Sequence, residues 1–264
     1  MSISFAVGGQ RVRFAGQTDV GQVRALNEDN ILVPEDIALG VVSDGMGGHA
    51  CGEVASQITV ETIEAFYHQT TENEPPTWPM RLPQADIERE RMVAAIKLAN
   101  AKIFETAAND ADKKGMGCTV DAAYVSKGRI FIGHVGDSRV YRLRGGVLSQ
   151  LTEDHSLLND YKRMKDMTAD DIANFRHKNV VVRALGLSEA VAVDVFVEET
   201  VAGDLYLLCS DGLTDMLDDA EVTEILNAGN RKRLDGIAGK LVDEANEAGG
   251  KDNISAVLIA IEDG

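Results

Sequence analysis

Hydrophobic and polar positions along this chain form two kinds of pattern. Short apolar runs, bounded by glycine, asparagine or charged residues, predict buried β-strands. These predicted strands cover residues 12–18, 29–33, 37–43, 118–126, 129–136, 138–144, 146–150, 191–198, 204–210 and 253–262. Lys127-Gly128 and Gly145-Gly146 separate neighbouring strands and are typical of tight hairpins, which join antiparallel strands. The hairpins therefore predict antiparallel sheets.

The second pattern is helical spacing, which occurs at about residues 51–68, 85–108, 219–227 and 231–247. In the first of these stretches, Val54, Ile58 and Phe66 fall on one face and glutamates fall on the other, as in a helix that packs on a sheet. A proline-rich connection follows at residues 75–83, and the segment 152–180 is predicted to be irregular. Strands and helices stand in separate blocks, which favours an α+β fold over a doubly wound parallel one.

Three of the apolar runs end on an aspartate beside a glycine, namely at Asp44-Gly45, Gly136-Asp137 and Asp211-Gly212. A single pair of this kind is typical of a turn, but the repetition indicates strands that carry carboxylates at their tips. Glu28-Asp29 and Asp252 also stand beside predicted strands. Carboxylates gathered in one place repel one another and need a cation.

The donor types indicate which cation. Carboxylates together with a backbone carbonyl such as that of Gly45 are hard oxygen ligands, which suit Mg²⁺ or Mn²⁺ and disfavour zinc and copper. The spacing of a calcium-binding EF-hand loop is absent from the sequence. The sequence therefore predicts a site for Mg²⁺ or Mn²⁺.

Five motifs in order carry a family resemblance. They are Arg24-x-x-Asn27-Glu28-Asp29, Ser43-Asp44-Gly45-Met46-Gly47-Gly48-His49, Gly136-Asp137-Ser138-Arg139, Ser210-Asp211-Gly212-Leu213-Thr214-Asp215 and Lys251-Asp252-Asn253-Ile254-Ser255. The set resembles that of the metal-dependent type 2C serine/threonine protein phosphatases in their bacterial form, over about residues 14–260. This resemblance implies two packed antiparallel sheets flanked by pairs of helices, in a four-layer αββα sandwich. It also implies a single catalytic domain over residues 1–264, with a flap at about 154–180.

The resemblance further implies a hydroxide that bridges two ions and attacks phosphoserine or phosphothreonine. Asp44 would bridge the two ions. Asp29 and the Gly45 carbonyl would hold one ion, directly or through water, and Asp211 and Asp252 the other. Asp137 with Asp211 would hold a third, weaker ion.

Arg24 is the expected substrate clamp, because its planar guanidinium matches two phosphate oxygens; the alternative is a surface ion pair. Arg139 is interpreted as structural, and the share of Glu28 in metal binding stays open. Met46 occupies a position where eukaryotic relatives carry a histidine, and it has no proton to donate to the leaving alcohol. Two histidines also stay open. His49 is expected to fix the turn through a hydrogen bond, while His155 is either a loop cap or a group near the metals.

Composition limits the kinds of partner that the protein is expected to bind. The chain has 264 residues and a formal net charge of −17, which argues against nucleic acid or an anionic membrane surface as a partner. It has no run of eighteen apolar residues, and its first residues do not resemble a signal peptide, so a cytoplasmic location is expected. Cys51, Cys118 and Cys209 are widely spaced and are expected to be reduced.

Phosphorylated proteins are the expected partners, among them a cognate serine/threonine kinase and its substrates, and the enzyme is expected to be a monomer. The flap has five lysines and arginines, which are Lys162, Arg163, Lys165, Arg176 and Lys178, and five aspartates. It is therefore locally neutral and suited to approach an anionic phosphopeptide; the alternative is a solvated spacer.

Two other functions stay open. One is an inactive phosphatase-like domain that only binds a partner, against which the four retained aspartates argue. The other is a hydrolase of small phosphorylated metabolites on the same fold.

Overall fold

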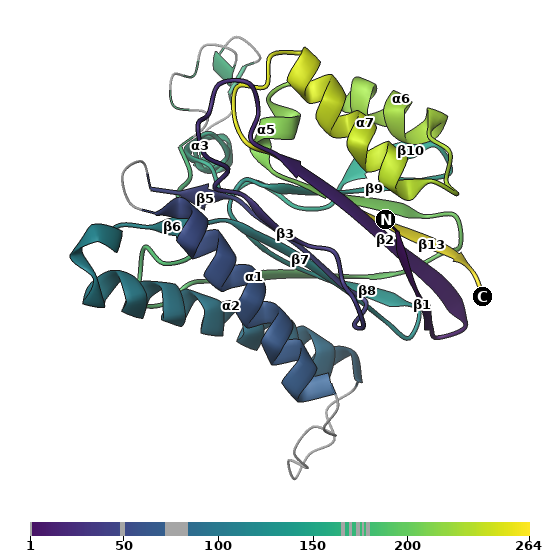
Figure 1. Cartoon of the computed structure of the whole chain (residues 1–264), viewed down its shortest axis with the longest axis horizontal. Coiled ribbons are helices and arrows are strands. Elements are labelled where there is room, and N and C mark those ends of the chain that lie inside the picture. Colours follow the sequence, from purple (N-terminus) through teal and green to yellow (C-terminus); the bar gives the residue numbers. More distant parts are fainter. Residues whose placement is uncertain are drawn as a thin grey trace.

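The fold consists of two antiparallel β-sheets packed face to face, with helices on both outer surfaces (Figure 1). It is seen in a computed structural model that describes residues 2–47, 51–71, 84–164, 167–168, 171–172, 175, 177 and 180–264. The α+β sandwich expected from the sequence is confirmed.

Each sheet has a fixed strand order, and every pairing is antiparallel. The six-stranded sheet runs β1 (Ile3–Val7), β2 (Gln10–Asp19), β13 (Ile254–Asp263), β12 (Leu205–Cys209), β9 (Arg139–Arg144), β10 (Val147–Gln150). The five-stranded sheet runs β11 (Asp194–Glu199), β8 (Arg129–Val135), β7 (Val120–Ser126), β4 (Leu39–Ser43), β3 (Asn30–Leu32). A short pair joins β5 (Gly45–Met46) and β6 (Gly117–Cys118).

Two pairs of helices form the outer layers. Helices α1 (Gly52–Thr71) and α2 (Gln84–Asn109) cover the five-stranded sheet, and α6 (Asp219–Ala228) and α7 (Leu234–Glu247) cover the six-stranded sheet (Figure 1). These four helices agree with the predicted ones to within a few residues. The proline-rich connection lies outside the described residues.

Burial on both faces explains why the strands read as continuous apolar runs. In β12, Leu205, Leu207 and Cys209 pack toward α6 and α7. Tyr206 and Leu208 of the same strand pack between the two sheets. A strand covered on both sides has no polar face, so the alternation typical of a half-exposed strand is lost.

Several elements differ from the sequence prediction. Strand β1 was not expected; it lies at a sheet edge and none of its residues is fully buried. The segment 152–180 was predicted to be irregular, but it contains helix α3 (Leu157–Met164), which also has no buried residue. A short helix, α5 (Asp211–Thr214), begins at one of the predicted aspartates, and a 3₁₀ turn, η1, spans Ala111–Lys113. Elements that bury little leave only a weak hydrophobic pattern in the sequence.

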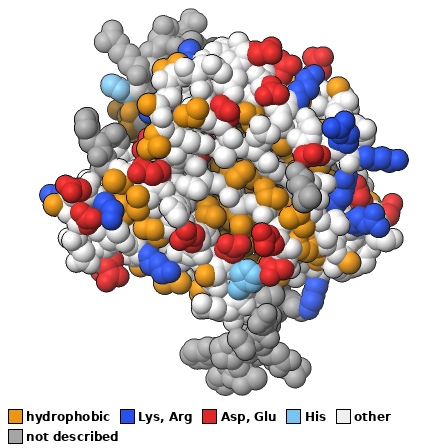
Figure 2. Space-filling view, in the orientation of Figure 1, with side chains coloured by type: hydrophobic (Ala, Val, Ile, Leu, Met, Phe, Trp, Pro, Cys, Tyr) orange, Lys and Arg blue, Asp and Glu red, His pale blue; other side chains and the backbone are white. Residues whose placement is uncertain are grey.

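Two surface properties bear on possible partners. Among the described residues, none of the helices has the length and apolar character needed to cross a membrane. On the face shown in Figure 2, acidic side chains occur at many separate points with basic ones among them. The negative charge on this face is therefore spread out instead of forming one acidic patch.

Candidate metal centre

The predicted carboxylates meet at one end of the sandwich. Asp44 follows β4, Asp137 follows β8, and Asp211 follows β12, while Asp29 and Asp252 precede β3 and β13. In antiparallel sheets the end of one strand lies beside the start of the next, so these five positions come to the same edge.

A pocket of about 350 Å³ opens there. Its lining residues are Arg24, Glu28, Asp44, Gly45, Met46, Gly47, Thr119, Asp137, Val181, Asp211 and Asp252. Every predicted site residue except Asp29 is therefore in the lining. His49 lies outside the described residues.

Asp29 lies behind the pocket wall and is 4 % exposed. Its Oδ2 accepts hydrogen bonds from Ser210 Oγ (2.8 Å) and Ser255 Oγ (2.6 Å). Its Oδ1 is buried and has no hydrogen-bond partner. Burial raises the pKa of Asp29 to about 7, the two serines oppose this shift, and the charges of Asp211 and Asp252 add to it. An unpaired buried carboxylate oxygen is costly, so this atom is suited to a water molecule or a cation.

Asp44 is held through its backbone by Thr119. Thr119 N donates to Asp44 O (2.8 Å), and Asp44 N donates to Thr119 Oγ1 (3.0 Å). Thr119 Oγ1 also lies 2.8 Å from Ser138 Oγ, next to Asp137. Thr119 therefore links two of the carboxylates. The sequence did not indicate it, because a threonine inside a predicted strand carries no distinguishing signal.

The loop that carries Arg24 and Glu28 is fixed by Asn253. Asn253 Oδ1 accepts from Glu28 N (2.8 Å), and its Nδ2 donates to the carbonyls of Val20 (3.0 Å) and Leu26 (2.9 Å). Asn253 is buried and directly follows Asp252. One amide side chain thus joins the N-terminal acidic motif to the C-terminal one.

Gly45 lies against this same loop. Its N–H donates to the Glu28 carbonyl (3.1 Å). A Cβ atom at Gly45 would collide with the carbonyl oxygens of Glu28 and Gly52. Only glycine fits at this position, which accounts for the glycine after Asp44 in the sequence.

Arg24 lies at the pocket mouth, with 48 % of its side chain exposed. Its Nη2 donates to Asp252 Oδ2 at 2.6 Å. This bond is the main reason that the pKa of Arg24 is raised; burial opposes the rise, and the charge of Asp252 supports it. The guanidinium therefore lies at the site, and its bond to Asp252 uses one nitrogen only.

The carboxylates raise one another's pKa values. Burial is the largest cause for Asp44, whose pKa is raised well above its ordinary range, and the charges of Asp29 and Asp211 add to it. Burial and then the charge of Asp211 raise the pKa of Asp137 to about 7. Burial and then the charge of Asp215 raise the pKa of Asp211 to about 6. Burial likewise raises the pKa of Glu28.

The side chains surround the pocket without closing on one point. Within the described part of the chain, no three His, Cys, Asp or Glu side chains form a group that could hold a metal ion in their present positions. The donor set and the unpaired Asp29 Oδ1 fit Mg²⁺ or Mn²⁺.

A second pocket, of about 490 Å³, adjoins the first and shares Asp137 and Asp211 with it. Arg139 lies in its wall and forms a two-pronged ion pair with Asp154 at 2.8–3.2 Å. This pairing agrees with the structural role expected for Arg139. His155 is 3 % exposed and lines neither pocket.

Comparisons with known proteins agree on one family. The family model described as protein phosphatase 2C matches residues 22–231. The chain is 38 % identical over 246 residues to the serine/threonine phosphatase stp of Listeria innocua serovar 6a, covering 92 % of this chain and 93 % of the relative. It is 33 % identical over 252 residues to the serine/threonine protein phosphatase PstP of Mycobacterium tuberculosis, covering 96 % of this chain and 45 % of the relative.

Solved structures give the same result. The serine/threonine phosphatase of S. agalactiae superposes with a TM-score of 0.83 at 34 % identity, covering 95 % of this chain and 100 % of that one. The catalytic domain of PstP, solved in complex with two manganese ions, superposes with a TM-score of 0.79 at 32 % identity, covering 96 % of this chain and 99 % of that one.

Proposed function

The chain belongs to the protein phosphatase 2C family, and we propose that it hydrolyses phosphoserine and phosphothreonine in proteins with the help of Mn²⁺ or Mg²⁺. The observation that carries this proposal is the gathering of Asp44, Asp137, Asp211 and Asp252 around one pocket. Burial, and after it the charges of neighbouring carboxylates, raise the pKa values of the first three, and bound divalent cations would favour the ionised forms.

The residues divide into ligands and supports. Asp44 would be shared by two ions, with the Gly45 carbonyl holding one and Asp211 and Asp252 holding the other. Asp137 with Asp211 would hold a third, weaker ion. For Asp29 we favour the water-mediated alternative, because two serines occupy its Oδ2 and only Oδ1 is unpaired. Bound divalent ions would supply Lewis acidity and a water molecule of lowered pKa.

The remaining steps belong to the protein's own side chains. Arg24 binds two phosphoryl oxygens with its planar fork, for which its bond to Asp252 must be shared or released. Met46 lies in the pocket lining and has no proton to donate. With Met46 excluded as the acid, we propose that a water molecule in the pocket gives the leaving alcohol its proton.

The wider context is also proposed. The substrates are phosphorylated proteins, and the opposing enzyme is a serine/threonine kinase that acts on them. The protein acts in the cytoplasm as a monomer; three free cysteines suit a reducing compartment. Residues 1–264 form one catalytic domain whose flap, at about 154–180, contributes Lys162 to the second pocket, where the lysine can contact an anionic phosphopeptide.

The test is a comparison of substrates with and without metal. Turnover of a small aryl phosphate should be lost in chelator and restored by Mn²⁺, which should also raise the melting temperature because it binds only the folded state. A phosphoserine peptide should be hydrolysed in preference to phosphorylated metabolites. Full activity in strong chelator would contradict the metal mechanism, and a preference for metabolites would favour the small-molecule alternative. No turnover despite Mn²⁺ binding would favour an inactive binding domain.

A further inference from the structure

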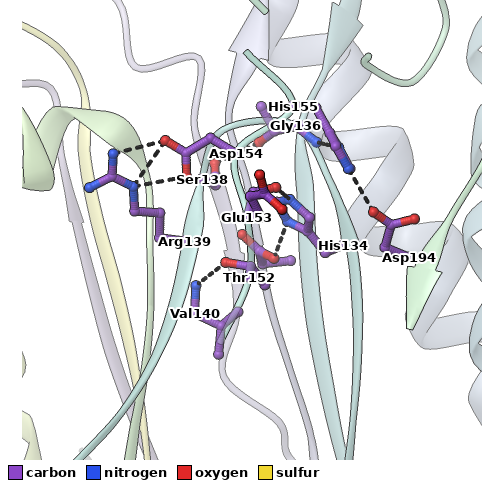
Figure 3. A network of polar contacts seen from close by, with 12 residues as sticks. His134, Gly136, Ser138, Arg139, Val140, Thr152, Glu153, Asp154, His155 and Asp194 are labelled. Atoms are coloured by element: carbon purple, nitrogen blue, oxygen red, sulfur yellow. Dashed lines mark hydrogen bonds and ion pairs between the residues drawn. The ribbon is translucent and has the colours of Figure 1, made fainter. Parts of the chain in front are cut away.

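The start of the flap is hydrogen-bonded, residue by residue, to the turn that carries Asp137. Figure 3 shows this flap base, residues 152–155, beside the end of β8 and the start of β9. Three of the bonds are Val140 N to Thr152 Oγ1 (3.0 Å), His134 Nε2 to the Glu153 carbonyl (3.1 Å), and Arg139 to the Asp154 carboxylate (2.8 Å at the shortest). The fourth residue, His155, makes the contacts that matter most for Asp137.

His155 binds both polar backbone atoms of Gly136. Its backbone N donates to Gly136 O (2.7 Å), and its Nδ1 accepts from Gly136 N (3.0 Å). Gly136 has φ = 125°, a region that favours glycine, and directly precedes Asp137. A Cβ at Gly136 would lie 2.5 Å from Thr119 Cβ, so the turn packs closely on the residue that holds Asp44. His155 therefore fixes both peptide units that lead into Asp137.

The protonation state of His155 follows from its partners. Nδ1 faces the Gly136 N–H and must carry a lone pair, so the ring proton is on Nε2 and is donated to Asp194 Oδ2 (2.8 Å). Arg183 Nη1 also lies 2.9 Å from Nε2, but its acceptor is Asp194 Oδ1, because Nε2 carries the proton. Burial is the main reason that the pKa of His155 is lowered to about 4, and the nearby charge of His134 contributes. His155 is thus a neutral acceptor for Gly136 at neutral pH.

His134 is the opposite case. Its two ring nitrogens face acceptors, namely Asp121 Oδ1 (2.8 Å) and the Glu153 carbonyl (3.1 Å), so both are protonated. Burial opposes this charge, but Asp121 and the carbonyl together outweigh it and raise the pKa of His134. Its ring lies 4.6 Å from that of His155, which discourages a second charge there.

His155 also joins the two ends of the flap. Its carbonyl accepts from Val182 N (2.8 Å), and Arg183 beyond it donates to Asp194 Oδ1 (3.2 Å). Val181, directly before Val182, lines the metal pocket. A movement of either flap end is therefore transmitted to His155, and through it to the Asp137 turn.

We propose that His155 is a positioning residue that holds the Asp137 carboxylate in the site by fixing Gly136 through Nδ1, and so couples the flap to the site. The inference rests on the proposed function, which assigns Asp137 to a divalent ion. The sequence left His155 open as a loop cap or a group near the metals. In the proposed role it lines neither pocket but positions one of the carboxylates that do.

Two variants distinguish the hydrogen bond made at the position of His155 Nδ1 from the one made at the position of Nε2. In His155→Asn the amide oxygen can take the place of Nδ1 and accept from Gly136 N, whereas in His155→Gln the amide reaches only the place of Nε2. Mn²⁺ affinity is measured by calorimetry. The Asp137-dependent part of that affinity is the difference between the parent and Asp137→Asn. We expect His155→Gln to weaken that part about tenfold or more, as outer-shell partners of metal ligands do, and His155→Asn to leave it near the parent.

A double variant excludes a general structural effect. In the Asp137→Asn background, His155→Gln should weaken Mn²⁺ binding no further, because the position it holds is no longer used. Equal weakening in both backgrounds, equal behaviour of the two His155 variants, or parent-like binding by His155→Gln would each overturn the proposal. If His155→Gln fails to fold, His155→Asn decides alone, since loss of the Asp137-dependent binding in that variant overturns it.

Hydrogen exchange of the Gly136 amide tests the positioning role without metal, and so independently of the proposed function. The Gly136 amide should exchange slowly in the parent and in His155→Asn, and rapidly in His155→Gln, without any metal. If the parent binds no Mn²⁺, the proposed function fails, and the exchange pattern then supports or overturns the positioning role by itself.

Discussion

The metal pocket and the flap base lie side by side but differ in how their carboxylates are paired. In and around the flap base three carboxylates have side-chain partners: Asp121 has His134, Asp154 has Arg139, and Asp194 has His155 and Arg183. In the pocket the aspartates mainly face one another, and the cation at its mouth, Arg24, is half-exposed. Paired charges stabilise a fold, whereas unpaired buried ones store repulsion that a ligand can relieve. The difference indicates that the flap base provides rigidity and the pocket provides binding.

The largest expected effect comes from removing a charge in the pocket. Asp44→Asn should lower turnover about a thousandfold, equivalent to about 4 kcal/mol in the barrier, because the charge that we propose bridges the two ions is lost. The metal-free variant should nevertheless be as stable as the parent or more so, since one member of a repelling group is gone. Steady-state kinetics with Mn²⁺ and urea unfolding in chelator measure the two effects.

An exposed aspartate on α7 provides the matched control for Asp44→Asn. Asp243→Asn also removes one negative charge and should change neither turnover nor stability appreciably. If metal-free Asp44→Asn unfolded far more easily than the parent, Asp44 would be a structural residue and the comparison between the two regions would not hold.

Removing a charge beside the flap base should instead lower the stability of the metal-free protein. Asp121→Asn leaves the buried His134 imidazolium without its counterion and should lower the free energy of unfolding by about 3 kcal/mol. Urea unfolding of the metal-free protein measures the loss, and Asp121→Asn combined with His134→Gln should recover part of it, because neither charge then remains. A loss equal to that of Asp243→Asn would show that the pair adds nothing.

The pH dependence of the metal-free protein has a definite sign. Asp29, Asp137 and Asp211 have folded pKa values raised to about 7, 7 and 6, so the native state holds protons that the unfolded chain has released. Their contribution to stability is complete below about pH 4 and is lost as the pH rises to about 7.

This loss is best measured as a difference between two proteins. Because the three groups are coupled, we expect metal-free stability to fall by about 2 kcal/mol relative to Asp44→Asn over that range. Saturating Mn²⁺ should remove the fall, since bound cations favour the ionised carboxylates. A parallel pH dependence of parent and variant in unfolding titrations would show that the aspartates do not repel one another as described.

The sequence predicted the pocket better than its supports. Asp44, Asp137 and Asp211 were found because each ends an apolar run beside a glycine, which is a local signal. Ser210, Ser255, Thr119 and Asn253 were not identified as supports, because their hydrogen bonds join positions up to 233 residues apart. Small polar residues in strands look alike until the strands are paired.

The flap base shows the same limit. The sequence left two interpretations open for His155. Its partners come from β11 and the β8–β9 turn, so no pattern near residue 155 contains them. Helix α3 and strand β1 were missed since neither buries a full apolar face. The layered fold was predictable because its strands are buried on both sides, which local hydrophobic runs record.

The smallest expected effect concerns the cation of the pocket. As the proposed phosphate clamp, the Arg24 guanidinium would bind the ground state and the transition state nearly alike. Arg24→Ala should therefore raise KM for a phosphopeptide about tenfold, equivalent to about 1.4 kcal/mol, with a smaller fall in kcat. Arg24→Lys keeps the charge near Asp252 but lacks the planar fork, so it should recover only part of the affinity. Steady-state kinetics at saturating Mn²⁺ separate the two constants. If both variants kept the parent KM, Arg24 would be only an ion-pair partner of Asp252, and the pocket would resemble the flap base in holding a cation for its own stability.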